Sequence, residues 1–159
     1  GADIIQGNAG ADTLDGGAGD DYIYLAEDSA ADVYSGGTDI DTLDASAVSG
    51  GGLIINLATN DIQVNAADPG AAIGADTISD FENVISGSGD DIITGTTGTN
   101  TIDAGAGNDT ITAGAGNDHV IGGAGNDIFM TVVRVVQIHL TLLMMAKRIH
   151  LSVVQALIH

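Results

Sequence analysis

The sequence predicts an all-β fold, a solenoid built from short strands and glycine-rich turns, on three observations. Residues 95–130 form a nine-residue unit that occurs four times in succession. In each unit a turn of small residues carries one side-chain oxygen at position 6. A strand triplet follows, with an apolar residue in the middle, at position 8. Because a triplet is too short to be stable alone, its apolar side chain must be buried by stacking one unit on the next, so the core grows only along the solenoid axis.

The composition of the turns predicts a metal site. Positions 2 and 4 are mostly glycine, which allows positive φ and lets the turn carbonyls point into one concavity. The aspartate at position 6 adds a charged oxygen beside them, and a hard cation that takes about six to eight oxygen ligands suits such a site. We therefore expect Ca²⁺ here. Position 6 is Asn100, Asp109, Asp118 and Asp127, and position 8 is Ile102, Ile111, Val120 and Phe129.

The unit Gly122-Gly-Ala-Gly-Asn-Asp127 resembles the RTX, or hemolysin-type, calcium-binding nonapeptide, whose pattern is G-G-x-G-x-D-x-U-x. The resemblance implies a parallel β-roll in which successive triplets alternate between two sheets. It also implies that Ca²⁺ lies between turns i and i+2 on the same edge. On that basis the best-supported site joins Asp109 to Asp127, while Asn100 with Asp118 forms a weaker or empty one because an amide lacks charge.

A second array occupies residues 1–44, with same-edge pairs Asp3 with Asp21, Asp12 with Asp32, and Asp21 with Asp41. The turn before Asp32, residues 27–31, has no glycine, so no site is assigned to Asp32. The candidate calcium ligands in the whole chain are turn glycines and position-6 aspartates: Asp3, Gly10, Asp12, Gly17, Gly19, Asp21, Asp41, Gly89, Asp91, Gly105, Gly107, Asp109, Gly114, Gly116, Asp118, Gly123, Gly125 and Asp127.

Between the arrays, residues 45–81 break the nine-residue period but keep β-type runs and turn signals. We expect longer β-coils or a hairpin stacked on the same solenoid, without calcium. The period then resumes with Asn83 at position 6, and Asp91 belongs to a unit shortened by one residue. The predicted organisation is an N-terminal array (1–44), intervening longer β-coils (45–81), a C-terminal array (82–130) and an irregular, non-repeat tail (131–159).

The tail contains no glycine, aspartate or glutamate. One interpretation is an amphipathic or buried helix. The favoured hypothesis is a frameshifted continuation of the array with no selected function, since Ile-His-Leu occurs at 138–140 and 149–151. With suitable codons, residues 135–140 read one base earlier can become Gly-Gly-Ala-Asp-Thr-Leu, and residues 147–151 can become Glu-Thr-Asp-Thr-Leu. A membrane span is not expected, because the longest uncharged run, 135–146, falls short of the roughly 20 residues required.

The charge distribution and the absence of catalytic motifs argue against several classes of function. All 22 acidic residues lie in residues 1–127, and the three basic ones follow them, which argues against nucleic-acid binding. No cysteine is present, so disulfides and thiolate metal sites are excluded. The chain has neither Gly-x-Ser-x-Gly nor His-Glu-x-x-His, and we predict no enzymatic activity. His119 is expected to face outward without binding metal, and the scattered threonines do not form a regular ice-binding ladder.

These features predict a secreted, extracellular module that folds when it binds several Ca²⁺ ions and that serves as a structural or secretion-assisting part of a larger protein. RTX proteins, by resemblance, are exported by a one-step (type I) machine through an uncleaved C-terminal signal. The chain starts inside a repeat unit, so we expect a longer parent. The alternative is an accessory module of a secreted protease, lipase or alginate epimerase that contacts an extracellular polysaccharide.

Overall fold

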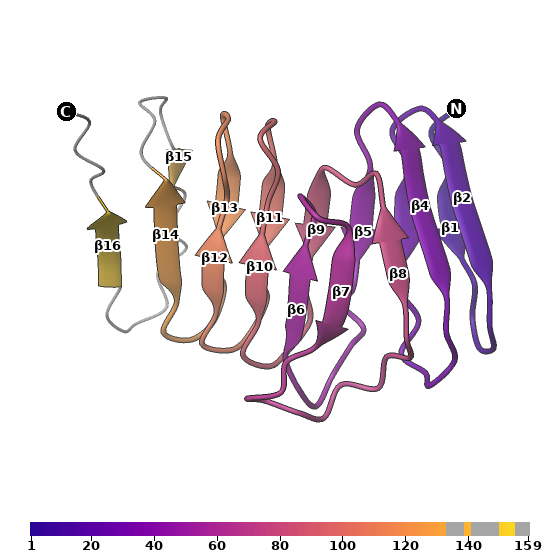
Figure 1. The fold of residues 1–159 in the computed structure, drawn as a ribbon, viewed down its shortest axis with the longest axis horizontal. Helices are drawn as coiled ribbons and strands as arrows, with labels where there is room; N and C mark the ends of the chain where they lie inside the picture. Colours follow the sequence, from indigo (N-terminus) through magenta and orange to yellow (C-terminus); the bar gives the residue numbers. More distant parts are fainter. Residues whose placement is uncertain (133–138, 141–149, 155–159) are drawn as a thin grey trace.

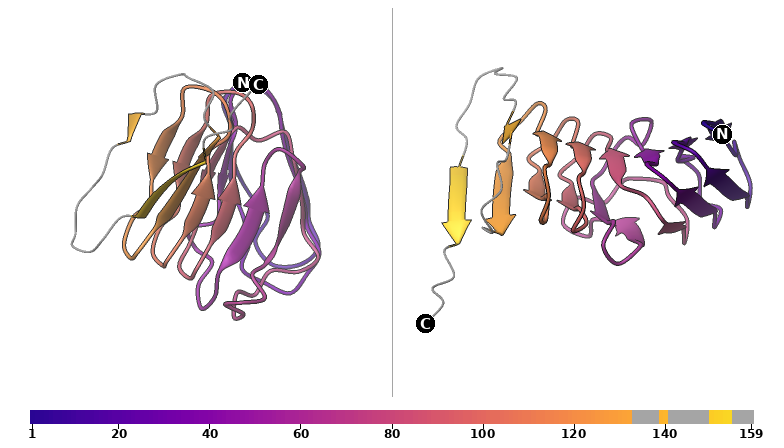
Figure 2. Two further views of the ribbon diagram at one scale, coloured as in Figure 1. Left: turned by 60° about the vertical axis from the view of Figure 1, so that its left-hand side comes forward. Right: turned by 90° about the horizontal axis from the view of Figure 1, so that it is seen from above.

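The computed structural model describes residues 1–132, 139–140 and 150–154. Parallel strands stack coil upon coil along one axis and form the faces of a solenoid (Figure 1). Viewed from above, the coils succeed one another in a single row from the N-terminus to the last strand (Figure 2). The expected all-β parallel roll is confirmed, and no helix occurs in these described ranges.

One face of the solenoid is a continuous seven-stranded sheet, here named the long sheet. It receives one strand from each coil, and its neighbouring strands are parallel. Its strands, in spatial order, are β1 (Ile4–Gln6), β3 (Tyr22–Tyr24), β5 (Thr42–Asp44), β9 (Asn83–Ile85), β11 (Thr101–Asp103), β13 (His119–Ile121) and β15 (His139–Leu140).

The opposite face is divided into two sheets. The N-terminal sheet contains β2 (Thr13–Ala18), β4 (Val33–Thr38) and β8 (Thr77–Ser79). The C-terminal sheet contains, in spatial order, β16 (His150–Val154), β14 (Ile128–Val132), β12 (Thr110–Thr112), β10 (Ile92–Thr94), β6 (Leu53–Asn56) and β7 (Asp61–Val64).

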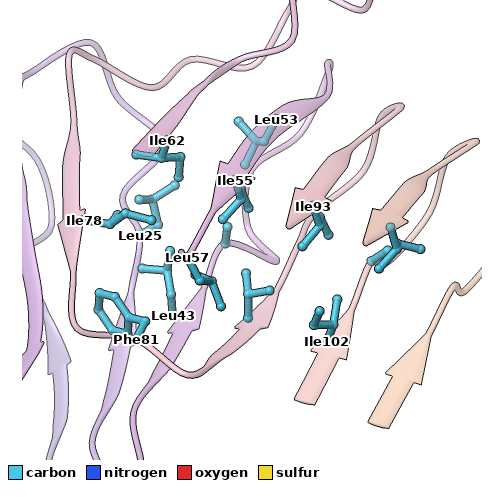
Figure 3. Close-up of a cluster of buried hydrophobic side chains, with 14 of the residues drawn as sticks. Leu25, Leu43, Leu53, Ile55, Leu57, Ile62, Ile78, Phe81, Ile93 and Ile102 are labelled. Carbon is cyan, nitrogen blue, oxygen red and sulfur yellow. The ribbon is translucent and has the colours of Figure 1, made fainter. Parts of the chain in front are cut away.

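The register follows directly from the repeat. Ile102 pairs with Val120 in the long sheet, and Ile93 pairs with Ile111 in the C-terminal sheet, in each case one full coil of two units away. This alternation places the position-8 side chains of both faces in the interior, where they form the core in place of a globular interior. Figure 3 shows part of this core, with Leu43 and Ile102 from the long sheet facing Ile55 and Ile93 from the other.

The predicted excursion over 45–81 is a hairpin. β6 and β7 pair antiparallel around Asn60, which has a φ of 57°, while β6 also pairs in parallel with β10. The hairpin thus caps one end of the C-terminal sheet, and β8 returns to pair with β4. The long sheet crosses this region without interruption, because β5 pairs with β9. Both arrays therefore share one ladder.

The tail is strand at every residue described. β14 runs to Val132, β15 pairs with β13, and β16 pairs with β14, so each face gains one further strand. The helical interpretation is wrong at these residues. The remaining tail positions, 133–138, 141–149 and 155–159, lie outside the described residues, and they make up most of the segment to which the frameshift hypothesis applies. Within the part of the chain that is described, no helix is long and apolar enough to cross a membrane.

Candidate calcium centre

The position-6 carboxylates form hydrogen-bonded ladders along the solenoid edges. The backbone N–H of Asp91 donates to Oδ1 of Asp109 at 2.9 Å, and the N–H of Asp109 donates to Oδ1 of Asp127 at 3.1 Å. Each bond spans 18 residues, which is one coil. A position-6 side chain therefore reaches back to the equivalent backbone position of the preceding coil, because the strand register superimposes successive turns.

The edge that leads into the long sheet carries the first ladder, which we name the long-sheet ladder. Asp3 N–H donates to Asp21 Oδ1 at 2.7 Å, and Asp21 N–H donates to Asp41 Oδ1 at 2.8 Å. Further along, Asn100 N–H donates to Asp118 Oδ1 at 3.0 Å. The predicted pairs Asp3 with Asp21 and Asp21 with Asp41 are thus brought together in the structure.

The opposite edge carries the short-sheet ladder. Asp12 N–H donates to Asp32 Oδ1 at 2.8 Å, and Leu53 N–H donates to Asp91 Oδ1 at 2.6 Å. Asp91, Asp109 and Asp127 continue this ladder along the C-terminal sheet. Asp109 and Asp127, expected to form the best-supported site, are therefore on the same edge in adjacent coils.

The second oxygen of most ladder carboxylates is buried without a donor. Since Oδ1 is used by the ladder, Oδ2 needs another partner, and leaving a buried carboxylate oxygen unpaired is costly. Within the described ranges no hydrogen-bond donor reaches Oδ2 of Asp12, Asp21, Asp41, Asp76, Asp91 and Asp109. A row of unpaired anionic oxygens inside an acidic rod requires cations, and this chemistry fits Ca²⁺.

Several buried ladder aspartates have raised pKa values, because no positive charge lies beside them among the described residues. Burial, the largest cause, and the charges of Asp91, Asp127 and Asp90 together raise the pKa of Asp109 to about 7, although its backbone hydrogen bond with Asp91 lowers it. Burial also raises the pKa of Asp41, Asp76, Asp91 and Asp127. The protein groups alone therefore disfavour the charged carboxylates, and a bound cation would reverse that preference.

The turns bring backbone carbonyls to the same edges. Turn residues stack in ladders of their own: Gly89 N–H donates to Ala106 O at 2.7 Å, and Gly107 N–H donates to Ala124 O at 2.8 Å. A Cβ on Gly107, whose φ is 151°, would lie 1.9 Å from Gly89 O. Glycine is required here both by its φ and by the close approach of the carbonyl one coil away.

Carboxylate and carbonyl oxygens converge at individual turns. A Cβ on Gly16 would lie 2.4 Å from Asp21 Oδ2 and 2.6 Å from Gly36 O, so both oxygens border the same small space. A Cβ on Gly122 would similarly lie 2.5 Å from Asp127 Oδ2. Over the described chain no group of three or more His, Asp or Glu side chains forms a metal cluster. Sites of this design would draw on one carboxylate per turn together with backbone carbonyls.

At two ladder positions, Asn100 and Asp32, the protein itself supplies a side-chain hydrogen-bond donor. Asn100 Nδ2 donates to Glu82 O at 2.6 Å, and Asn100 Oδ1 accepts from Thr96 N–H at 2.8 Å. At Asp32, Oδ2 accepts a hydrogen bond of 2.8 Å from the hydroxyl of Tyr34. An amide or phenol thus supplies positive dipole at these two places.

Two ladder residues were missed in the sequence. The prediction that Asn83 occupies position 6 is wrong, because Leu43 pairs with Val84 and thereby places Glu82 at position 6. Glu82 Oε2 accepts from Asp41 N–H at 2.9 Å. The signal was ambiguous, since both Val84 and Ile85 are apolar and only Val84 is fully buried.

Asp76 is the second missed residue. Its Oδ1 accepts from Asp32 N–H at 2.9 Å, so it extends the short-sheet ladder although no calcium ligand was expected within 45–81. The sequence Asp76-Thr-Ile-Ser79 matches positions 6 to 9 of the repeat, and that match could have identified it. The turn before Asp76 lacks the two glycines that precede the aspartate in a regular unit, so the motif is incomplete there.

Adjacent acidic residues in the turns do not form paired acids. Asp90 is exposed, and its Oδ1 accepts from Asn108 N–H at 2.7 Å, whereas Asp91 is buried and belongs to the short-sheet ladder. The two carboxylates thus face separate ladders, in agreement with the divergence expected for neighbouring residues. Their arrangement serves the repeat rather than acid–base geometry.

A solenoid of nonapeptide coils with unpaired carboxylate oxygens on both edges defines a calcium-binding repeat protein. Comparison with protein families agrees. The model of the RTX calcium-binding nonapeptide repeat matches in four copies, over residues 1–29, 76–110, 85–120 and 94–129, which together cover more than half of the chain. The chain therefore belongs to the RTX calcium-binding repeat family, and its cofactor is Ca²⁺, with several ions in the module. No curated protein matches the chain.

Proposed function

We propose that this chain is the calcium-dependent folding module of a larger exported protein, and that it acts outside the cell. The unpaired Oδ2 atoms carry the proposal, because they provide carboxylate oxygens at a regular spacing that bound cations would neutralise. The formal net charge is −19, and all of the negative charge lies before residue 128. Without calcium, repulsion among these carboxylates opposes the stacking of coils that individually bury little surface.

Calcium binding and folding would then be one event. The Asp109–Asp127 and Asp91–Asp109 turns would hold ions between adjacent coils on the short-sheet edge, and Asp3, Asp21 and Asp41 would do so on the other edge. Affinities of extracellular calcium modules are of order 10⁻⁴ to 10⁻³ M. Such values keep the chain unfolded at cytosolic calcium levels and folded outside, which suits passage through an export channel.

The proposed module consists of two calcium arrays, residues 1–44 and 82–130, separated by the longer β-coils of residues 45–81. Residues 131–159 form a non-repeat tail. Nothing in this arrangement calls for catalysis, and we propose a non-enzymatic role. The structural alternative for the parent is a surface protein in which the roll is a spacer.

An accessory role beside a secreted enzyme is the second candidate, and one exposed face favours it. On the outer side of the C-terminal sheet, Ile92, Thr110 and Ile128 stand in register on adjacent strands. Ile92 and Ile128 are 38% and 40% exposed. A row of apolar and hydroxyl groups on adjacent strands suits contact with the face of a sugar ring in a polysaccharide chain. Retention of the calcium-loaded chain on an extracellular polysaccharide, lost on Ile92→Lys, would favour this parent.

Circular dichroism of the 159-residue chain in calcium-depleted and millimolar-calcium buffers tests the main proposal. We expect a largely disordered spectrum without calcium and a β spectrum with it, while millimolar Mg²⁺ produces little change because Mg²⁺ dehydrates reluctantly. Equal β content under all three conditions would refute the proposal.

A further inference from the structure

The hydroxyl of Tyr34 lies where neighbouring turns of the short-sheet ladder have an unpaired carboxylate oxygen. We propose that Tyr34 determines which turn of this ladder needs no metal: its hydroxyl closes the Asp32 turn in place of a calcium ion, so the protein alone holds this turn together. The inference rests on the proposed calcium-dependent folding of the other turns. It goes beyond that function because it exempts one turn from the dependence.

Both oxygens of the Asp32 carboxylate have a donor from the protein. Asp12 N–H donates to Oδ1 at 2.8 Å, and the Tyr34 hydroxyl donates to Oδ2 at 2.8 Å. Asp12 and Asp76 precede and follow Asp32 in the short-sheet ladder, and each has a buried Oδ2 without a donor. The three aspartates share one edge of the solenoid, so the difference between them arises locally, at the Asp32 turn.

The Tyr34 hydroxyl is also used as an acceptor. It accepts from Ala26 N–H at 3.0 Å while it donates to Asp32, and the tyrosine side chain is buried. Burial raises the pKa of Tyr34 above its ordinary value, so the phenol keeps its proton and remains a donor. A hydrogen bond to a buried carboxylate is charge-assisted and is among the stronger kinds. The bonds from Ala26 through Tyr34 and Asp32 to Asp12 thus tie this turn to its own strand and to the preceding coil.

Tyr34 reaches Asp32 because it occupies position 8 of the repeat, two residues after the aspartate. Leu14 and Ile78 pair with Tyr34 in register on the neighbouring strands β2 and β4's other partner, β8. Both belong to the same core but carry no polar side-chain atom. Among these three paired residues, only the phenol can therefore donate to a position-6 carboxylate.

The turn before Asp32 also differs in its backbone. None of residues 27–31 has a positive φ, whereas the position-4 glycines of most other turns do. Side chains close this turn instead: Asp28 Oδ1 accepts from Ala30 N–H at 2.7 Å, and Asp28 Oδ2 accepts from Gly10 N–H at 3.0 Å. The backbone geometry that aims carbonyls at an ion elsewhere is missing here. This observation is independent of Tyr34 and points to the same conclusion, a turn closed without metal.

Residue-resolved amide hydrogen exchange of the full chain, measured during a calcium titration, compares this turn with a calcium-dependent one. Asp12 N–H reports on the Asp32 carboxylate, and Asp91 N–H reports on the Asp109 carboxylate. At the calcium concentration that half-protects Asp91 N–H, we expect Asp12 N–H to be the more protected of the two.

Tyr34→Phe isolates the contribution of the hydroxyl. The ring stays in the core, where Phe129 already occupies the equivalent position 8 of another coil. We expect protection of Asp12 N–H to fall about 10- to 100-fold at that calcium concentration, because Asp32 Oδ2 loses its donor. Tyr24→Phe is the matched control, since it removes the same atom from a half-buried tyrosine on β3, and it should leave the protection of Asp12 N–H unchanged.

The outcomes separate the inference from the proposed function. If Asp12 and Asp91 amides gain protection at the same calcium concentration, or if Tyr34→Phe acts no more strongly than Tyr24→Phe, the inference is wrong and the proposed function stands. If both amides remain protected in excess chelator, the proposed function and the inference fail together.

Calorimetry with calcium provides a second test on the full chain. Asp32→Asn keeps an acceptor for Asp12 N–H, and we expect it to leave the number of bound ions unchanged. Asp12→Asn changes the neighbouring ladder residue in the same way, and we expect it to weaken calcium binding roughly 10-fold because its unpaired Oδ2 is available to an ion. Loss of one bound ion in Asp32→Asn would show that the Asp32 turn holds calcium and would overturn the inference.

Discussion

The backbone N–H of Asp91 donates to Oδ1 of Asp109 at 2.9 Å, and this bond leaves Oδ2 of Asp109 buried without a donor. One carboxylate therefore has two separate tasks: its first oxygen fixes the register of adjacent coils, and its second is available to a cation. Because the tasks belong to different oxygens, substitutions separate them.

Replacing Asp109 with asparagine tests the second task. Asp109→Asn retains an acceptor for Asp91 N–H but removes the charge, so we expect calcium affinity to fall roughly 10- to 100-fold while strand register persists. Isothermal titration calorimetry measures the affinity. Asp15→Asn, at an exposed strand position, is the matched control and should leave affinity unchanged. Equal effects of the two variants would mean that Asp109 acts only through net charge.

Replacing glycine in two turns tests the close approach of successive coils. Gly107→Ala would place a Cβ 1.9 Å from Gly89 O. That carbonyl belongs to the backbone of the neighbouring coil, and relieving the clash would require the two stacked turns to separate. Gly10, with a φ of 107°, has no neighbouring atom within 4 Å of its added Cβ. We expect Gly10→Ala to cost about 1 to 3 kcal/mol through backbone strain alone.

Gly107→Ala should cost more than that and should also weaken calcium binding. Thermal unfolding in saturating calcium measures both variants. Similar unfolding midpoints would show that φ, and not the distance between coils, selects glycine at these turns.

Adding a charge at Asn100 tests the interpretation of its amide as a substitute for an ion. In the present chain Asn100 Nδ2 donates to Glu82 O. Asn100→Asp removes that donor, and it creates a second carboxylate beside Asp118 on the long-sheet edge. We expect calorimetry to detect about one additional calcium ion per chain. Unchanged stoichiometry with reduced stability would show that this turn lacks the carbonyl oxygens for a site.

The pH dependence should have opposite signs with and without calcium. The folded pKa of Asp109 is about 7, above its ordinary value, so its contribution to the stability of the metal-free fold is fully present below about pH 4. That contribution is lost as the pH rises through about 7. Calcium requires the deprotonated carboxylate, so its affinity should rise over the same range.

Circular dichroism from pH 4 to 8, in calcium-depleted buffer and during calcium titration, measures both trends. We expect residual β structure without calcium to be greatest at the acidic end, and half-saturation to need the least calcium at the alkaline end. A calcium midpoint independent of pH would contradict the assignment of Asp109 as a ligand.

The repeat explains why so much of this fold could be predicted. The position-8 residues Ile102, Ile111 and Val120 set the register of both faces, because only one side of each short strand is buried. Where the nine-residue period breaks, the sequence no longer shows which residue of a strand faces the core. At Glu82 the choice between Val84 and Ile85 as the inward residue shifted the ladder by one position, and tertiary pairing with Leu43 decided it.

Interactions between distant residues could not be inferred from spacing. Asp76 joins Asp32 across 44 residues, because the hairpin removes an intervening segment from the stack. Side-chain partners of this kind depend on the folded path and have no periodic signature.

The carboxylate ladders have a direction. In every bond of the long-sheet and short-sheet ladders the later residue supplies the oxygen and the earlier one supplies the N–H, as from Asp21 back to Asp3 and from Asp127 back to Asp109. The N–H of each position-6 turn therefore has no ladder acceptor until the following coil is stacked on it, so each coil is completed by the coil that comes after it in the sequence.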